Sequence, residues 1–139
     1  RDVAPSRGLG DVYKRQDYFR PRFDEIEDIQ EINKCEILII KKDGSRYIFN
    51  DVMSSIRRLP ADPDDMTDEQ VVFEFMQRFR SMRILRAYNI SDLHELTGIS
   101  MSTLSRYDNG ETTPTVINLR KLAKALKCGL SDLILMEYE

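Results

Sequence analysis

The side chains best suited to chemistry in this sequence gather between residues 100 and 109, and their types suit binding better than catalysis. Ser102, Ser105 and Arg106 fall on the outer side of a short helix predicted over Met101 to Asp108. Hydroxyl groups donate and accept single hydrogen bonds, and the planar guanidinium of arginine fits a guanine edge or a phosphate with two donors. Small polar groups around one arginine indicate a hydrogen-bonding surface.

The inventory of reactive side chains argues against an enzyme. The chain of 139 residues has one histidine, His94, and two cysteines, Cys35 and Cys128, which are too far apart for a zinc motif. No Ser/His/Asp arrangement and no phosphate-binding glycine loop occurs. We therefore predict a non-enzyme with no cofactor and no metal. Both cysteines are interpreted as reduced thiols, which indicates a cytoplasmic protein. The longest apolar block is only Ile37 to Ile40, too short to span a membrane, so we expect no membrane partner.

Charge is unevenly distributed along the chain. The net charge is −3 overall, yet residues 78–128 carry nine Lys and Arg against four Asp and Glu, a local net charge of +5. Residues 1–77 carry 12 basic against 17 acidic residues. A basic segment flanked by acidic ones is compatible with a polyanionic partner for that segment.

Short helices must position residues 100–109. Gly98 ends a helix that begins near Asp92, because a glycine accepts the left-handed conformation of a helix end. Ser100 can cap the next helix, and Pro114 opens the one after that. The residues predicted to form the core here are Leu93, Ile99, Leu104 and Tyr107, followed by the stripe Val116, Leu119, Leu122, Ala123 and Leu126.

A longer helix precedes these. Thr67 and Gln70 have the spacing of a capping box, and an apolar stripe runs from Val72 to Met82, which predicts a helix ending near Ala87. Gly129 stops the last long helix, and a final short turn is predicted over Leu130 to Ile134. The other face of the first helix carries four arginines, which are spread around more than half of the helix, so at most one or two are expected to contact DNA phosphates: Arg78, Arg80, Arg83 and Arg86.

This ordered series resembles the helix–turn–helix domain of the lambda-repressor-like group, also called the Cro/C1 or Xre type, over residues about 71–135. The resemblance implies five helices, double-stranded DNA as partner, a homodimer, and insertion of helix 101–109 into the major groove. Two departures, His94 and the serines where the family has glutamines, leave the base preference open. The matching residues are Leu93, Thr97 to Ser100, Ser102 to Arg106, Asn109, Gly110, Pro114 and Leu122 to Leu126.

On that resemblance we predict a DNA-binding surface with no catalytic or metal-binding residue. Arg106 is expected to bind DNA, the alternative being a surface ion pair with Asp108 or Glu111. Met101 is either a thymine-methyl contact or a rim residue, and His94 is expected to be a packed or half-exposed helix residue. The predicted DNA-binding residues are Ser100, Met101, Ser102, Thr103, Ser105, Arg106, Asn109 and Thr115.

The N-terminal half is predicted to be a β-rich unit. Asp43-Gly44 is a strong hairpin signal between the apolar run 35–40 and the strand-like run 46–50. Ile26, Ile29 and Ile32 favour a preceding strand over a helix, whereas residues 51–59 fit either a helix capped by Asn50 or non-helical structure. Residues 1–16 are either foreign adapter-like sequence or a native disordered arm.

The predicted fold class is therefore α+β, a small N-terminal antiparallel β meander or hairpin followed by an all-α five-helix domain. We place a β-rich domain over 17–59, a linker rich in proline and acids over 60–66, and the helix–turn–helix domain over 67–139. The predicted function is sequence-specific DNA binding by a transcriptional regulator, most simply a repressor. The alternative is an antitoxin-like protein whose N-terminal domain binds a partner protein.

Overall fold

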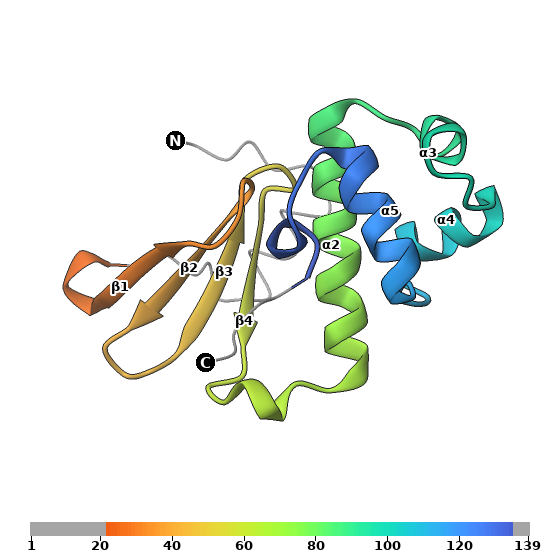
Figure 1. Ribbon diagram of the computed structural model, residues 1–139. Coiled ribbons are helices and arrows are strands. Elements are labelled where there is room, and N and C mark those ends of the chain that lie inside the picture. The colour runs from red at the N-terminus through yellow and green to blue at the C-terminus, as the bar shows by residue number, and fades with distance from the viewer. Residues whose placement is uncertain (1–21, 135–139) are drawn as a thin grey trace. The chain divides into compact units, whose positions relative to one another are not determined.

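The computed structural model describes residues 22–134, so the leader predicted over residues 1–16 lies outside the described residues (Figure 1). The chain divides into two compact units that meet between Met66 and Thr67. The first unit is a β-sheet and the second is helical, an α+β layout.

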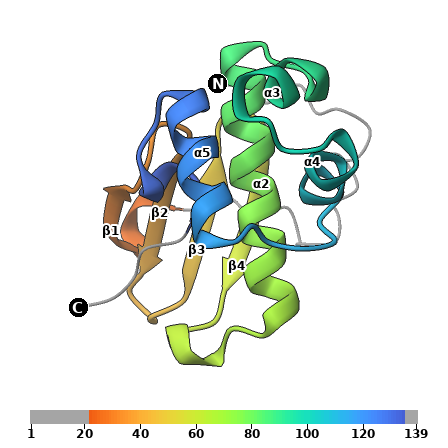
Figure 2. The same ribbon diagram turned by 45° about the vertical axis from the view of Figure 1, so that its right-hand side comes forward.

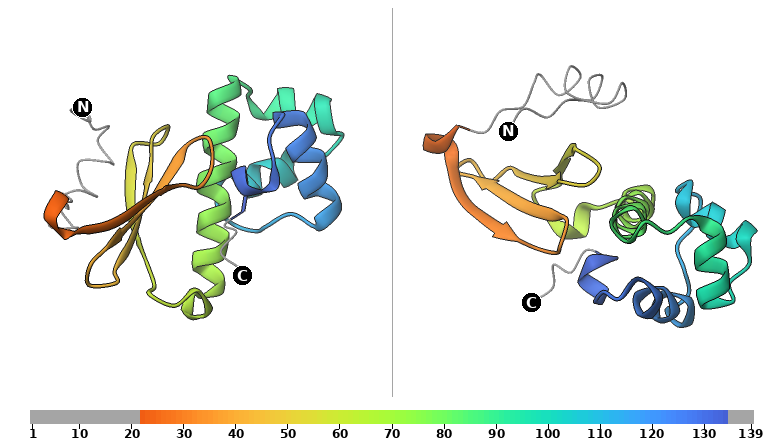
Figure 3. Two further views of the ribbon diagram at one scale, coloured as in Figure 1. Left: turned by 60° about the vertical axis from the view of Figure 1, so that its left-hand side comes forward. Right: turned by 90° about the horizontal axis from the view of Figure 1, so that it is seen from above.

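The first unit is a four-stranded antiparallel meander. A 3-10 turn, η1 (Phe23–Glu25), leads into strands β1 (Ile26–Glu31), β2 (Glu36–Lys41), β3 (Arg46–Asn50) and β4 (Ser55–Leu59). Each strand pairs with the next, in the order β1-β2-β3-β4, as Figure 3 shows. The predicted meander is confirmed, and a sheet of this size has the three or more strands that a stable unit needs.

The β2–β3 turn is the predicted Asp43-Gly44 hairpin. Gly44 has φ +88°, a left-handed conformation that a side chain would strain. The Asp43 carboxylate accepts hydrogen bonds from both the backbone N–H (2.9 Å) and the hydroxyl (2.6 Å) of Ser45. These two bonds hold the pKa of Asp43 below its usual range, because hydrogen bonding favours the ionised carboxyl.

Residues 51–59 form a turn followed by strand β4. The sequence was compatible with either a helix or non-helical structure here. Asn50 does cap this segment, since its side chain accepts a hydrogen bond from the Met53 backbone at 2.7 Å, but the residues after it do not continue as a helix. Ser54 has φ +53° and reverses the chain, after which Ser55 to Leu59 pair with β3. Pairing with a neighbouring strand outweighs the helical spacing of the apolar residues.

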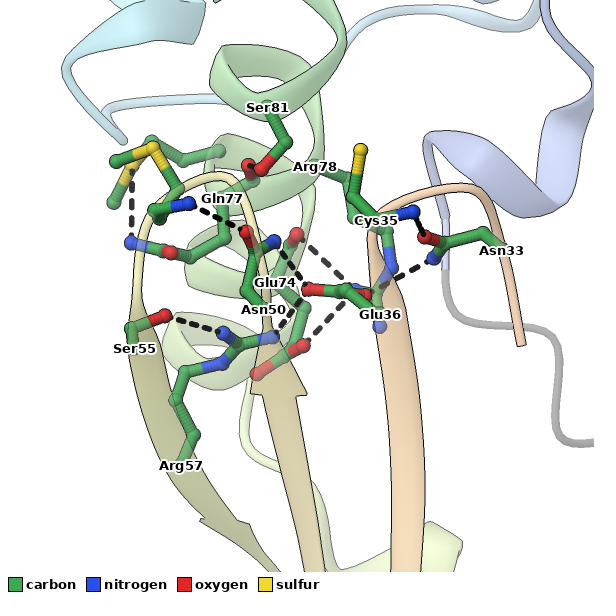
Figure 4. A network of polar contacts seen from close by, with 12 residues as sticks. Asn33, Cys35, Glu36, Asn50, Ser55, Arg57, Glu74, Gln77, Arg78 and Ser81 are labelled. Atoms are coloured by element: carbon green, nitrogen blue, oxygen red, sulfur yellow. Dashed lines mark hydrogen bonds and ion pairs between the residues drawn. The ribbon is translucent and has the colours of Figure 1, made fainter. Parts of the chain in front are cut away.

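A carboxylate joins the ends of three strands. The Glu36 side chain accepts hydrogen bonds from Asn33 at 3.0 Å, Asn50 at 2.9 Å and Arg57 at 3.0 Å (Figure 4). The register places Glu36 opposite Asn50, and Asn50 opposite Ser55 on β4. This network therefore fixes the relative positions of β2, β3 and β4 at one end of the sheet.

The second unit contains four α-helices within the described residues: α2 (Asp68–Arg86), α3 (Ile90–Thr97), α4 (Met101–Asp108) and α5 (Val116–Leu126) (Figure 2). The predicted capping box of α2 is present, with Thr67 and Gln70 bonded to each other's backbone N–H. Five helices were predicted, and that number is wrong for this part of the chain. In place of the fifth there is a single 3-10 turn, η3 (Leu130–Asp132).

The shortness of η3 has a local cause. The Asp132 carboxylate accepts a hydrogen bond from the Gly129 backbone at 3.0 Å, which closes the turn on itself. Leu133 then has φ −119° and is fully buried, so this residue anchors the turn in the core of the unit. One turn is enough to bring Leu133 inward.

Aromatic side chains form the centre of the helical core. Phe75 and Phe79 of α2 stack with ring centroids 5.7 Å apart, and Tyr107 of α4 meets both rings edge-on at 5.8 and 6.2 Å. The predicted core residues Leu93, Ile99, Leu104 and Tyr107 are all buried. Val116, also predicted as core, is 82% exposed. It is the first residue of α5, one turn before Leu119, and the buried residues of this helix are Leu122 and Leu126.

We predict that Ser45→Ala raises the pKa of Asp43 toward its ordinary value of about 3.9, because one of the two donors is lost. The folded-state pKa is depressed, so the bonds stabilise the fold at neutral pH, and that contribution disappears as the pH falls through the folded pKa. Ser45→Ala should lessen this acid-dependent loss. The measurement is an NMR titration of the Asp43 carboxyl carbon in the full chain. Ser45→Thr keeps a hydroxyl and is the control, and an unchanged midpoint in Ser45→Ala would contradict the assignment.

Candidate nucleic-acid interface

The candidate interface is built on α3, the turn after it and α4. Gly98 has φ +78° and ends α3, and Ile99 follows as a buried side chain at 6% exposure. His94 contacts this turn directly, with its Nδ1 atom 2.7 Å from the carbonyl oxygen of Ile99. The Thr97 hydroxyl accepts a hydrogen bond from the Ile99 backbone at 3.1 Å. These contacts fix the angle at which α4 leaves α3.

Ser100 begins α4 as its cap. Its hydroxyl accepts a hydrogen bond from the backbone N–H of Thr103 at 3.2 Å and lies 2.8 Å from the Thr103 hydroxyl and 3.3 Å from that of Ser102. Three of the predicted site residues therefore form one hydroxyl cluster at the N-terminus of α4. The cluster stabilises the helix and presents hydrogen-bonding groups at its surface.

The structure brings most of the predicted site residues together on α4 and its two caps. Met101 is 47% exposed, and the Arg106 side chain is 61% exposed. Leu104 and Tyr107 point inward and Asp108 faces α2, whereas Met101, Ser102 and Arg106 are exposed. Of the other predicted residues, Ser100, Ser102, Asn109 and Thr115 are exposed, and Thr103 and Ser105 are half-buried.

Thr115 lies beyond α4 in sequence but is tied to it through α5. It caps α5, accepting a hydrogen bond from the Asn118 backbone at 3.2 Å. The Asn118 side chain donates a hydrogen bond to the hydroxyl of Tyr107, on the last turn of α4, at 3.0 Å. The start of α5 is thereby held against the end of α4. The sequence analysis did not identify Asn118 as a functional residue. Its partner, Tyr107, is eleven residues away and was predicted only to be a core residue.

The arginines of α2 do not form an exposed face, since Arg78 is buried and the other three are half-buried. Arg80 donates from Nε to the backbone carbonyl of Asp108 at 2.7 Å. Arg83 donates to the Asp108 carboxylate from Nη2 at 2.9 Å and from Nε at 3.2 Å. Both arginines therefore bind the C-terminal end of α4, where the helix dipole and the free carbonyl groups favour a cation.

The other two arginines of α2 are also engaged. Arg86 donates to the carbonyl oxygens of Leu126 at 2.8 Å and Lys127 at 3.0 Å, at the end of α5. Arg78 pairs with Glu74 within the helix, at 2.9 Å. The helix that the sequence suggested as a source of phosphate contacts uses its guanidinium groups to hold the other helices in place. Nothing in the local periodicity could have revealed partners 25 to 41 residues away.

The end of α4 is closed by a Schellman motif, a paired backbone turn at a helix C-terminus. Gly110, with φ +74°, donates to the carbonyl of Tyr107 at 3.2 Å, and Glu111 donates from its backbone to the carbonyl of Arg106 at 2.9 Å. The Glu111 carboxylate lies 3.9 Å from the Nε of Arg106. Of the two ion-pair partners considered for Arg106, Glu111 is the one observed, while Asp108 is bound by the α2 arginines.

Over residues 22–134, no group of three or more His, Cys, Asp and Glu side chains is placed to hold a metal ion. In the same range, no helix combines the length and the apolar character required to span a bilayer.

Comparison with known proteins identifies the domain. Residues 78–139 match the family of Cro/C1-type HTH DNA-binding domains. The chain therefore carries a Cro/C1-type helix–turn–helix DNA-binding domain in its C-terminal part, as the resemblance predicted. No curated protein sequence matches the chain.

Three solved structures show similarity to this chain. One is the restriction-modification controller protein C.AhdI from Aeromonas hydrophila, with 27% identity over 45% of this chain and 96% of that one, at a TM-score of 0.43. Another is an HTH_3 family transcriptional regulator from Vibrio cholerae, with 27% identity over 48% and 38% of the two chains, at 0.46. A hypothetical transcription factor, NHTF from Neisseria, has 23% identity over 55% and 86%, at 0.45.

We predict that Arg83→Met lowers the free energy of unfolding of the helical unit by about 1–3 kcal/mol, because Asp108 loses its closest cation in a site where both side chains are only 19% exposed. Urea unfolding followed through amide signals of α2 and α4 measures this. In an Asp108→Asn background, Arg83→Met should lower the free energy of unfolding by a smaller amount. Strictly additive effects of the two substitutions would show that the pair contributes nothing.

Proposed function

We propose that the protein is a transcriptional regulator, acting as a repressor, that binds a two-fold symmetric DNA site as a homodimer. The observation that carries the proposal is the outward face of α4, where small hydroxyl side chains surround one exposed arginine. Such a face fits the major groove closely, because small residues allow the helix to approach the base edges.

Six of the eight predicted contact residues have a specific role in this proposal. Arg106 reads a guanine edge with its paired donors, and Ser102 and Ser105 bond to base edges or phosphates. Met101 packs on a thymine methyl group. Asn109 and Thr115 flank the helix and bind the phosphate backbone, Thr115 from a helix N-terminus, where backbone N–H groups attract anions.

Electrostatics supports the same proposal. Residues 78–128 carry a net charge of +5, although the chain as a whole carries −3. Three of the α2 arginines lie beside carboxylates, and Arg86 binds backbone carbonyls, which leave its charge in place. The exposed cations of this segment are Arg106, three residues of α5 and the residue that follows it: Arg120, Lys121, Lys124 and Lys127. We therefore infer moderate non-specific affinity and a modest dependence on salt.

Selection of the full chain against a random duplex library tests the proposal. At about 50 and about 200 mM salt, we expect enrichment of a two-fold symmetric motif whose half-sites lie about one helical turn apart. Enrichment of a motif at both concentrations would support base readout by a dimer. Binding that is unselective and disappears at the higher concentration would contradict it, and a partner protein for the N-terminal unit would become the better explanation.

We predict that Arg106→Ala lowers affinity for the selected duplex by roughly 1–3 kcal/mol and relaxes the preference at one base pair. Titration of the selected duplex and of its single-base variants measures both effects. Arg120→Ala removes the same charge from α5 and is the control, because it should weaken binding to all duplexes by a similar factor. If the two variants behave alike, Arg106 is not a base-reading residue.

A further inference from the structure

An acidic side chain lies beside the one basic residue of α4. Within Met101–Asp108 the only cation is Arg106, and the Oε1 atom of Glu111 is 3.9 Å from its Nε. Both side chains are more than half exposed, at 61% and 56%. A carboxylate in this position is unexpected on a surface that must approach a polyanion, since it opposes the attraction that the basic segment provides.

The backbone, and not chance, brings the two side chains together. Glu111 is the residue whose N–H closes the outer hydrogen bond of the Schellman motif onto the carbonyl of Arg106, at 2.9 Å. In this motif the side chains at these two positions regularly contact each other, usually through apolar groups. Here the contact is an ion pair. The positive φ of Gly110 fixes the turn, so the carboxylate stays next to the guanidinium.

The other nearby acid, Asp108, does not pair with Arg106. Asp108 is bound through its carboxylate by Arg83 and lies 3.7 Å from Arg80, on the side of α4 that faces α2. The charge next to Arg106 is therefore set by Glu111.

The geometry leaves the two terminal guanidinium nitrogens of Arg106 accessible. The carboxylate approaches Nε, whereas the two terminal nitrogens can still form a paired contact. A guanine edge is neutral and tolerates the neighbouring carboxylate, but a phosphate bound by Arg106 would be repelled by it. Between exposed charges this repulsion is small and corresponds to roughly a twofold to fivefold change in affinity.

We propose that Glu111 is a specificity-determining residue, which disfavours the use of Arg106 as a phosphate contact and so favours its use in reading a base. This inference rests on the proposed function of α4. It predicts that the ratio of affinities for the selected and the random duplex depends on Glu111, although Glu111 itself does not bind DNA.

The test compares Glu111→Gln with the wild type in the full chain, using the selected duplex and a pool of random 30-base-pair duplexes as probes. The substitution keeps the backbone N–H of the Schellman motif, so the fold should persist, and amide spectra check this. Binding to the random pool should tighten about twofold to fivefold, and its salt slope should rise by up to about one. Affinity for the selected duplex should change less, so the affinity ratio falls.

Three variants separate this effect from general charge. Glu95→Gln removes the same charge from an exposed position on α3 and should leave the ratio unchanged. Glu111→Asp retains the carboxylate and should retain the ratio. In an Arg106→Gln background, Glu111→Gln should no longer alter the ratio, because the cation through which it acts is gone.

The outcomes are distinct. If the wild type selects no motif, the proposed function fails first. If it selects a motif and Glu111→Gln leaves the ratio unchanged, the inference alone is overturned. An equal fall of the ratio in Glu95→Gln, or a fall that persists without Arg106, would also overturn it, since the effect would then be long-range repulsion and not control of one side chain.

Discussion

The pairing of Asp108 with Arg80 and Arg83 is the interaction on which the arrangement of the helical unit depends. An eight-residue helix has little stability alone, and most of the carbonyl groups in its last turn lack partners inside the helix. Here one arginine binds a terminal carbonyl and another binds the carboxylate of the same residue. The two contacts join the end of α4 to the C-terminal half of α2. Without them, the direction of α4 would rest on apolar packing, which holds position less strictly than paired hydrogen bonds do.

Apolar packing then sets the distance between the same two helices. The Tyr107 ring lies edge-on to both Phe75 and Phe79, and its hydroxyl accepts a hydrogen bond from Asn118. One side chain therefore connects α4 with α2 through its ring and with α5 through its oxygen. Residues 101–106 are held outward by two kinds of contact. Polar contacts fix the end of α4, and aromatic contacts fix its inner face.

Local signals in the sequence predicted the elements well where a short stretch determines the conformation. Asp43-Gly44 indicated the hairpin, Thr67 and Gln70 the start of α2, and Gly98 the end of α3, because each acts within three or four residues. The Cro/C1-type domain was predicted from the resemblance of this ordered series to that family. What could not be predicted depends on distant partners. Strand β4 exists because β3 pairs with it, and three of the α2 arginines, Arg80, Arg83 and Arg86, bind helix ends that are 25 or more residues away.

The candidate site was predicted unevenly for the same reason. The positions on α4 follow from the helix period, so the outward face could be read from the sequence. The partner of Arg106 could not be chosen between two acids until the structure showed that Asp108 belongs to α2. Val116 was assigned to the core by periodicity, yet the first turn of α5 extends beyond the surface that buries the rest of that helix.

The binding of helix ends by the arginines of α2 has a consequence for how this domain can be transferred between genes. The family match begins at residue 78, in the middle of that helix, whereas the helix begins at Asp68 with a cap at Thr67. Phe75 and Glu74 fall in the unmatched turns, and they pack against Tyr107 and pair with Arg78 respectively. A recombination event at the edge of the recognisable motif would cut the helix that holds the others. A gene fusion that joins a new N-terminal partner to this domain would keep it intact only if the junction falls before Thr67.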